Sequence, residues 1–282
     1  MRSLLFVPAD DAKKQAKALN SETDAIILDM EDSVSLKNKV MARDVVKEFF
    51  AQTSTEKIII VRINALDTEF WRDDMAVIAD LAPDYILVPK ARSGEDIATI
   101  NALIEKSSNA ANKTKIIALV TETPESIFNM ASFKNCANRL SALTWGAEDL
   151  SAEIGAQTNK DQNGVYFPVY QLARSWCLLG ASNAEVSAID SVFTNFKDDD
   201  GLRAEAIVAK TEGFWGKMII HPRQIKIVNE VFTVSDSEIA HAKEVIDAIE
   251  NSKMGGVAQL NGEMIDQPHY KRALRVVMRQ QK

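Results

Sequence analysis

Two apolar segments of this chain end in paired carboxylates. Glu31 and Asp32 follow the run AIILDM, and Glu148 and Asp149 follow the run LTWGA. Carboxylates in such positions can bind a divalent cation, act as general acids or bases, or cap the helices that follow. The chemistry therefore depends on whether the fold brings the two segment ends together.

Arg62 lies at the end of a third apolar run, and Glu122 follows a fourth. Glu122 and Asp149 are one strand-and-helix unit apart, so their side chains can converge from neighbouring strands. Two carboxylates, completed by water and substrate oxygens, can hold Mg²⁺. Helix capping explains the same two acids. Arg62 presents a planar fork that can bind a carboxylate or enolate oxygen, or can pair with Glu31 or Asp32.

Lys13 and Lys17 stand four positions apart in a helix-period stretch that follows Pro8. Helix N-termini favour phosphates, and two lysines on one face would add to an anion site there. Exposed helical lysines are usually only solvated, so the spacing leaves both uses open.

The elements that would position these residues alternate along the chain. Apolar runs typical of buried strands occupy residues 3–7, 25–28, 58–63, 85–88, 116–120, 143–145, 186–189 and 217–220. Helix-period stretches occupy residues 12–19, 37–51, 70–79, 95–106, 124–130, 166–179, 201–212 and 222–231. This alternation predicts a (β/α)8 TIM barrel, whose active site lies at the carboxyl ends of the strands. The alternative, a doubly wound open sheet, favours a glycine-rich turn after the first strand, and FVPADDAKK has none.

The last part of the chain has a different pattern. A helix is expected at residues 237–250, and VAQLNGEMID then has two β-prone arms around Asn261-Gly262, a pair that favours a hairpin turn. Pro268 can open a final helix over residues 270–278. We therefore predict a barrel domain at residues 1–250 and a C-terminal lid or swapped arm at residues 251–282.

Composition narrows the class of protein. The formal net charge is −7, and this acidic balance disfavours nucleic acid as a partner. Two cysteines without metal-type spacing predict neither a zinc site nor a disulfide scaffold. The apolar runs are too short for a signal peptide or a membrane span, so we expect a cytoplasmic protein without a membrane partner.

Ordered motifs along nearly the whole chain resemble those of one enzyme family. They are RSLLFVPADD, AIILDMEDSV, VRINALDT, LVPKARSGEDI, LVTETPESI, WGAEDL, GFWGKMIIHPRQI, VNEVFTVS and LNGEMIDQP. The chain is in this respect similar to the citrate lyase beta subunit-like enzymes of the HpcH/HpaI aldolase superfamily, which include malyl-CoA and citramalyl-CoA lyases. The resemblance implies a β/α barrel that binds Mg²⁺, acts on a small-molecule thioester and assembles as a homotrimer or hexamer.

The resemblance also implies roles for catalytic residues. Glu122 and Asp149 match the Mg²⁺ ligands, and Arg62 matches the arginine that holds the substrate. Asp266, in the C-terminal MID motif, matches a catalytic acid or base that comes from the arm of a neighbouring subunit. Its other interpretation is a cap on the last helix.

Binding of CoA follows from the same resemblance. Lys13 and Lys17 match lysines that hold the CoA phosphates, and Phe6 stands where an aromatic residue lines the CoA pocket. Ala9 departs from a glycine that is common in the family, and its methyl group is expected to crowd this loop and weaken phosphate binding.

Two further groups complete the predicted site. Backbone N–H groups around Gly146, Ala147 and Glu148 would hold the substrate carboxylate. Glu31 and Asp32 would orient the substrate-binding arginine and the water ligands of the metal without binding the metal themselves.

The predicted reaction cleaves a citryl-, citramalyl- or malyl-CoA type thioester into acetyl-CoA and a 2-oxo acid. One alternative is a CoA-independent class II aldolase that releases pyruvate or oxaloacetate with the same metal chemistry. Others are a citrate lyase beta subunit that works on a carrier-bound citryl thioester, and a non-catalytic subunit of a larger complex.

Overall fold

The computed structural model describes residues 1–109, 113–252 and 256–280. Contacts divide the chain into two compact units, Met1–Val231 and Phe232–Lys282. Throughout the described parts of the chain, every helix is too short or too polar to cross a lipid bilayer.

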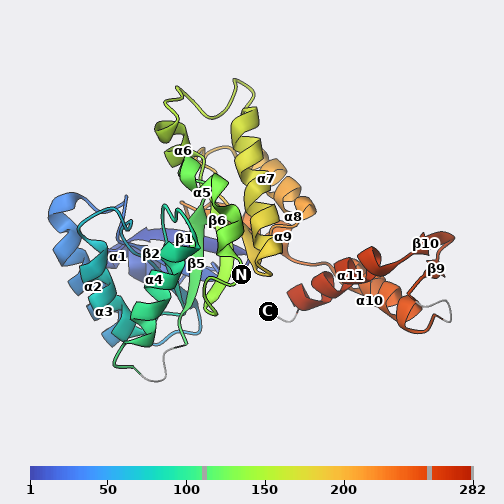
Figure 1. The fold of residues 1–282 in the computed structure, drawn as a ribbon, viewed down its shortest axis with the longest axis horizontal. Helices are drawn as coiled ribbons and strands as arrows, with labels where there is room; N and C mark the ends of the chain where they lie inside the picture. Colours follow the sequence, from blue (N-terminus) through green and yellow to red (C-terminus); the bar gives the residue numbers. More distant parts are fainter. Residues whose placement is uncertain (110–112, 253–255, 281–282) are drawn as a thin grey trace. The chain divides into compact units, whose positions relative to one another are not determined.

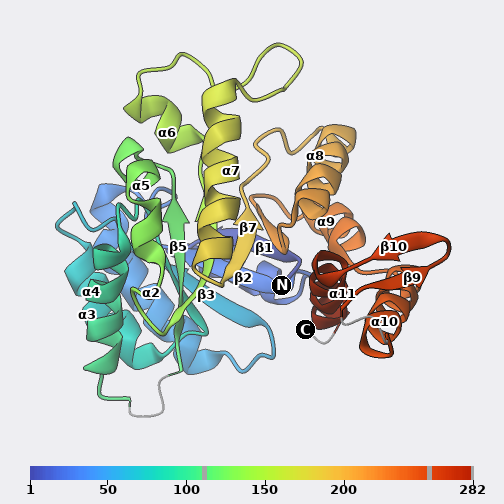
Figure 2. The same ribbon diagram turned by 45° about the vertical axis from the view of Figure 1, so that its right-hand side comes forward.

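The first unit contains a closed barrel of parallel strands that follow one another in sequence order (Figures 1 and 2). The strands are β1 (Ser3–Pro8), β2 (Ala25–Asp29), β3 (Ile58–Arg62), β4 (Tyr85–Val88), β5 (Lys115–Val120), β6 (Leu140–Trp145), β7 (Ser187–Asp190) and β8 (Gly216–Ile219). The barrel closes between β1 and β8, where Leu4 lies opposite Met218. The prediction of a (β/α)8 barrel is confirmed.

The barrel strands are buried on both faces. Ile27, Ile60 and Ile117 belong to the apolar cluster that fills the barrel interior. Ile26 and Val61, at the alternate positions of β2 and β3, are also fully buried. Strands covered on both faces read as continuous apolar runs rich in branched residues, which is why they could be found in the sequence.

Helices connect the strands and surround the barrel (Figure 2). They are α1 (Ala12–Leu19), η1 (Leu36–Asn38), α2 (Lys39–Gln52), α3 (Trp71–Leu81), α4 (Gly94–Glu105), α5 (Pro124–Phe128), η2 (Met130–Phe133), α6 (Glu148–Glu153), α7 (Pro168–Asn183), α8 (Asp199–Glu212) and α9 (Gln224–Phe232). Asp11 caps α1 by accepting from the N–H of Lys14. α7 begins with Pro168, two residues after the expected start, because proline is favoured in the first turn of a helix.

The second unit consists of a helix, a hairpin and a helix. Its elements are α10 (Asp236–Glu250), β9 (Ala258–Leu260), β10 (Glu263–Ile265) and α11 (Gln267–Gln280). Ser235 and Glu238 form a capping box at the start of α10. Asn261 and Gly262 both have positive φ, as the expected two-residue turn requires.

α10 belongs to this second unit. Its apolar face packs into one small core that is made of Ala242, Val245, Ile249, Ile265 and Ala273. The helical periodicity of residues 237–250 predicts this helix as part of the barrel domain, with the boundary after residue 250. Helical periodicity identifies an apolar face but does not show which core that face joins.

Candidate active site

A cavity of about 440 Å³ lies at the carboxyl ends of the barrel strands. Its lining includes Phe6, Asp29, Asp32, Arg62, Glu122, Gly146, Ala147, Glu148 and Asp149. Catalytic groups of (β/α)8 barrels gather at this end, where loops carry side chains from several strands. The cavity thus brings together most of the residues that the sequence singled out.

Arg62, the last residue of β3, is held rigidly in this cavity. Its Nε and Nη2 atoms donate to the two carboxylate oxygens of Asp29, both at 2.7 Å. Its Nη1 atom lies 2.9 Å from Glu31 Oε2, and its guanidinium stacks 4.8 Å from the centre of the Phe6 ring. Burial alone would lower the pKa of Arg62, but Asp29 and Glu31 outweigh it and raise the pKa, so the charge is permanent.

Asp29 is a site residue to which sequence reasoning gave no role. It ends β2 and lies opposite Arg62 in the β2–β3 register. Main-chain N–H groups of Glu31 and Ser33 also donate to its carboxylate. Burial would raise the pKa of Asp29, yet Arg62 and these hydrogen bonds hold it below its usual range. The expected pairing of Arg62 with Glu31 is present, but the bidentate partner is Asp29.

Glu122 follows β5 and is almost fully buried. The cap of α5 is Thr123, which accepts from the N–H of Ser126, so the capping interpretation of Glu122 is wrong. Its Oε2 atom accepts from the main-chain N–H of Lys90 at 2.7 Å. Burial, together with the charges of Asp149 and Glu31, raises the pKa of Glu122 well above its usual range.

Gly146 leaves room for the Glu122 side chain. A Cβ atom at Gly146 would lie 2.9 Å from Glu122 Cγ and 3.0 Å from its Oε1. The glycine therefore lets the loop after β6 pass directly against the carboxylate. Ala147 next to it is the N-terminal boundary of α6 and makes no side-chain cap. The helix begins at Glu148, so Asp149 lies in its first turn rather than at the cap position.

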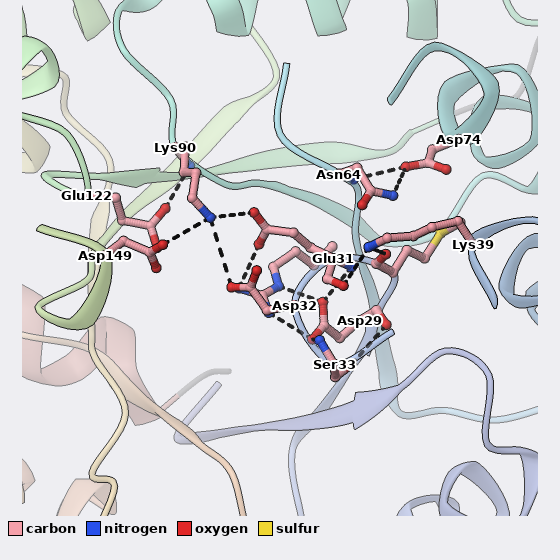
Figure 3. Close-up of polar contacts among 12 residues, drawn as sticks. Asp29, Glu31, Asp32, Ser33, Lys39, Asn64, Asp74, Lys90, Glu122 and Asp149 are labelled. Atoms are coloured by element: carbon pink, nitrogen blue, oxygen red, sulfur yellow. Dashed lines mark hydrogen bonds and ion pairs between the residues drawn. The ribbon is translucent and has the colours of Figure 1, made fainter. Parts of the chain in front are cut away.

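Lys90 connects the carboxylates of the two paired-acid segments (Figure 3). Its Nζ atom lies 2.7 Å from Glu31 Oε1, 3.1 Å from Asp149 Oδ1 and 3.9 Å from Asp32 Oδ2. Burial would lower the pKa of Lys90, but Glu31 and the neighbouring acids raise it. Lys90 is thus a further residue of the site to which the sequence patterns gave no role.

The acids of the cavity outnumber the cations in contact with them. Glu31, Asp32, Glu122 and Asp149 carry up to four negative charges, against the positive charges of Lys90 and of Arg62, which Asp29 also neutralises. Glu122 is a buried carboxylate with a raised pKa, and Asp149 lies beside it, so the pair is not fully neutralised by positive charge. A divalent cation would supply that charge. Over the described residues, no three His, Cys, Asp or Glu side chains surround one point, so a cation here would need water or substrate oxygens as further ligands.

The remaining predicted positions of the barrel lie around the cavity and on α1. Glu148 Oε1 accepts from Asn159 Nδ2 at 2.9 Å. Lys13 and Lys17 are exposed on α1, as an anion site would require. Ala9 is fully buried, and its φ is not in the left-handed range, so its methyl group causes no backbone strain.

Asp266 precedes α11 in the second unit. Its Oδ1 atom lies 2.6 Å from His269 Nδ1, and its side chain is 41% exposed. The helical spacing of three residues, which puts both side chains on one face, is the signal that could have shown this contact.

Comparisons with known proteins agree with this arrangement. The family model described as HpcH/HpaI aldolase/citrate lyase matches residues 2–222. A (3S)-malyl-CoA thioesterase of Cereibacter sphaeroides is 34% identical over 271 residues, which are 95% of this chain and 90% of the relative. The citrate lyase subunit beta of Leuconostoc mesenteroides subsp. cremoris is 32% identical over 284 residues, with 98% and 92% covered.

A solved structure matches along the full length of the chain. The protein CitE from Mycobacterium tuberculosis, in complex with magnesium, acetoacetate and coenzyme A, superposes with a TM-score of 0.79 at 28% identity. The match covers 100% of this chain and 98% of that one. The motifs, the closed barrel and these relatives lead to one assignment: the chain belongs to the HpcH/HpaI aldolase/citrate lyase family.

Proposed function

We propose that this protein is a Mg²⁺-dependent carbon–carbon lyase that cleaves a malyl-, citramalyl- or citryl-CoA type thioester into acetyl-CoA and a 2-oxo acid. The observation that carries the proposal is the buried Glu122 beside Asp149 at the mouth of the barrel. The names of relatives support the substrate class, since one of 31% identity is an L-malyl-CoA/beta-methylmalyl-CoA lyase from Cereibacter sphaeroides.

Glu122 and Asp149 would hold the metal. The raised pKa of Glu122 and the space that Gly146 leaves beside it support this assignment. When bound, the ion would supply Lewis-acid chemistry at the hydroxyl and carboxylate oxygens of the substrate. Backbone N–H groups of the Gly146–Ala147–Glu148 segment would orient the substrate carboxylate.

Arg62 would stabilise charge on the reacting oxygens. In the cleavage direction, the hydroxyl group would give its proton to the carboxylate of Asp266, and the bond from its carbon to the α carbon of the thioester breaks. The carbinol carbon becomes the 2-oxo carbonyl carbon of the released acid, and the electron pair of the broken bond passes to the thioester enolate. Because Asp29 holds the guanidinium in place, Arg62 is preorganised to stabilise that charge. A preorganised cation stabilises the transition state more than a mobile one does.

Asp266 would donate the proton that converts the enolate carbon into the methyl group of acetyl-CoA. We assign it to the arm of a neighbouring subunit in a homotrimer or hexamer, and CoA phosphates to Lys13 and Lys17 with Phe6 beside the thioester. The family membership supports these roles. The exposed lysines on α1 and the exposed carboxylate of Asp266 are compatible with them.

Hydrolysis of the thioester is a second candidate function. The observation that favours it is the group of relatives of 32% to 34% identity that are named (3S)-malyl-CoA thioesterase. Hydrolysis would release free CoA and leave the carbon skeleton intact, whereas cleavage by a lyase releases a 2-oxo acid and keeps the thioester.

One assay separates these functions. The protein is incubated with malyl-CoA, citramalyl-CoA and citryl-CoA in parallel, with Mg²⁺ or with EDTA, and both the 2-oxo acid and the free thiol are measured. A 2-oxo acid without free thiol, abolished by EDTA, is the expected result. Free thiol without a 2-oxo acid would establish the thioesterase. If none of the three thioesters yields either product, both the lyase and the thioesterase function would be contradicted. The remaining candidates would then be the CoA-independent aldolase and a carrier-dependent citrate lyase subunit.

A further inference from the structure

Lys90 contacts the proposed metal site through both its main chain and its side chain (Figure 3). Its N–H donates to Glu122 Oε2 at 2.7 Å, while its ammonium lies between Glu31 and Asp149. A single residue therefore touches both proposed metal ligands and the acid that pairs with Arg62.

The backbone of Lys90 is held in an unfavourable conformation to make these contacts. Its φ is +47°, in the left-handed range that residues with a side chain rarely adopt. Such strain persists where the surroundings fix it, and it is concentrated at functional sites. The left-handed turn after β4 lets the N–H of Lys90 reach Glu122 while its side chain reaches Glu31 and Asp149.

The two ammonium contacts are unequal. Lys90 Nζ donates a hydrogen bond to Glu31 at 2.7 Å, and the Glu31 side chain is 7% exposed. Its distance to Asp149 is 3.1 Å, and that side chain is 31% exposed. Asp149 is thus the more loosely held and more accessible of the two partners.

We propose that the Lys90 ammonium is a built-in counter-ion of the Mg²⁺ site, which holds Asp149 until a divalent cation takes that carboxylate and which then remains on Glu31. The inference rests on the proposed Mg²⁺ site of Glu122 and Asp149. Lys90 and the cation compete for the same carboxylate, and after the exchange their positive charges lie close together. Lys90 therefore weakens cation binding and, in return, holds the carboxylates of Glu31 and Asp149 in place while no cation is bound.

Calorimetric titration of the full chain with Mg²⁺, in the absence of thioester, tests this directly. Lys90→Met keeps the length of the side chain, the main-chain N–H to Glu122 and the backbone strain, but removes the charge. Its Mg²⁺ dissociation constant should be lower than that of the wild type by about tenfold or more, because a repelling charge has been removed. Lys90→Arg, which keeps the charge, should stay near the wild type.

Lys134→Met is the matched control. Lys134 is exposed after η2, in the connection that leads to the start of β6, so it lies away from the carboxyl ends of the strands. The substitution changes the net charge equally and should leave Mg²⁺ affinity unchanged. Circular dichroism verifies folding, and Lys90→Gln replaces Lys90→Met in the comparison if the methionine variant does not fold.

Each outcome bears on one statement. Unchanged or weaker Mg²⁺ binding in Lys90→Met would overturn the counter-ion role, and weaker binding would show that Lys90 only organises the acids. If Lys134→Met also binds Mg²⁺ more tightly than the wild type, the gain in affinity would come from net charge alone. That result would overturn the counter-ion role as well. If the wild type binds no Mg²⁺, the proposed metal site itself fails, which is a separate result.

Discussion

The position of Arg62 is set by the strand beside its own. Asp29 ends β2 opposite Arg62, so register brings the carboxylate and the guanidinium together and two parallel hydrogen bonds fix the plane of the fork. A lysine at the same position keeps the charge but cannot form the fork. The geometry of the charge is therefore as important as its sign.

Arg62→Lys should lower the turnover number by about 10²- to 10³-fold, the range for losing one preorganised donor to a developing oxyanion. Steady-state kinetics with the active thioester measures this. Arg43→Lys is the control, because Arg43 forms a buried ion pair with Asp74 in which its Nε donates at 2.8 Å. Arg43 does not line the cavity. Equal loss of turnover in both variants would point to general destabilisation and contradict the role of Arg62.

Asp266→Asn should abolish turnover and leave Mg²⁺ affinity intact, because the amide cannot exchange the proton and the proposed metal ligands are elsewhere. Kinetics and Mg²⁺ calorimetry on the same sample measure the two quantities. Glu263→Gln removes the same charge from an exposed position of the hairpin and should keep wild-type turnover. Wild-type rates in Asp266→Asn would refute its role as acid or base.

Sequence reasoning reached the acids of the site more easily than their partners. Glu122, Glu148 and Asp149 stand out because charged residues directly follow apolar runs. Asp29 also stands at the end of an apolar run, but only the strand register shows that it lies opposite Arg62. The role of Lys90 depends on its left-handed φ, which the sequence does not indicate for a lysine.

At the scale of elements, a chain of buried charges ties the outside of the barrel to the helices around it. Lys217 of β8 is fully buried and lies 2.7 Å from Asp190 Oδ2 and 2.7 Å from Glu205 Oε1. Glu205 in turn pairs with Lys160, in the loop between α6 and α7. Asp190 accepts from the indole N–H of Trp145, which lines the cavity. The network thus connects the α6–α7 loop to one wall of the site.

Lys217→Met should lower the free energy of unfolding by about 3–5 kcal/mol, because Asp190 and Glu205 lose their buried partner. Burial would raise the pKa of Asp190, but Lys217 and Arg174 hold it below its usual range. This contribution to stability is present above the pKa of an unfolded Asp, about 3.9, and is lost as pH falls through the folded pKa. Urea unfolding between neutral pH and pH 3 should therefore show a smaller loss of stability in the variant than in the wild type.

Lys226→Met is the control for this prediction, since Lys226 is 82% exposed. It should unfold like the wild type at every pH. An equally steep acid dependence in Lys217→Met and the wild type would contradict the assignment of the stabilisation to the Lys217–Asp190 pair.

The order of the elements was predictable from the sequence, but the membership of α10 was not. Strands that are buried on both faces appear in the sequence as short continuous apolar runs, which can be recognised directly. Caps such as Asp11 mark helix starts chemically. The unit to which a helix belongs is decided by packing between residues far apart in sequence, here between α10 and α11.

At the scale of the whole molecule, the outer face of α7 is suited to self-association. Val169, Leu172, Trp176 and Leu179 follow one another at three- or four-residue spacing and are between 37% and 59% exposed. The charged residue of this helix, Arg174, pairs with Asp190 and Glu212. A face rich in large apolar side chains and poor in charge is typical of the centre of a protein interface.

Leu172→Glu combined with Leu179→Glu should reduce the molar mass in solution from that of the proposed oligomer to that of a monomer, because charges would have to be buried in an interface formed by this face. Light scattering during size-exclusion chromatography measures this. Ile207→Glu combined with Val208→Glu places the same charges on α8, where the exposures are 51% and 49%, and should leave the mass unchanged. An oligomer that survives both charges on α7 would exclude this face as the interface.

The proposed sharing of active sites requires more than association, since Asp266 would then have to reach a neighbouring barrel from the arm of its own chain. In the Glu122→Ala chain the barrel lacks a proposed metal ligand but the arm keeps Asp266. In the Asp266→Asn chain the barrel keeps Glu122 but the arm lacks the proposed acid. If the arm serves a neighbouring barrel, a mixed oligomer contains complete sites. Random mixing of equal amounts in a ring should restore about a quarter of the wild-type turnover. If the arm serves its own barrel, no mixture contains a complete site.

The two variants are therefore unfolded and refolded together and assayed with the active thioester, and native mass spectrometry shows that mixed oligomers have formed. Each variant refolded alone sets the background. Activity that appears only in the mixture places Asp266 in a neighbouring subunit's site. Mixed oligomers as inactive as their parents would assign the acid to its own barrel, and the arm would then act within one chain.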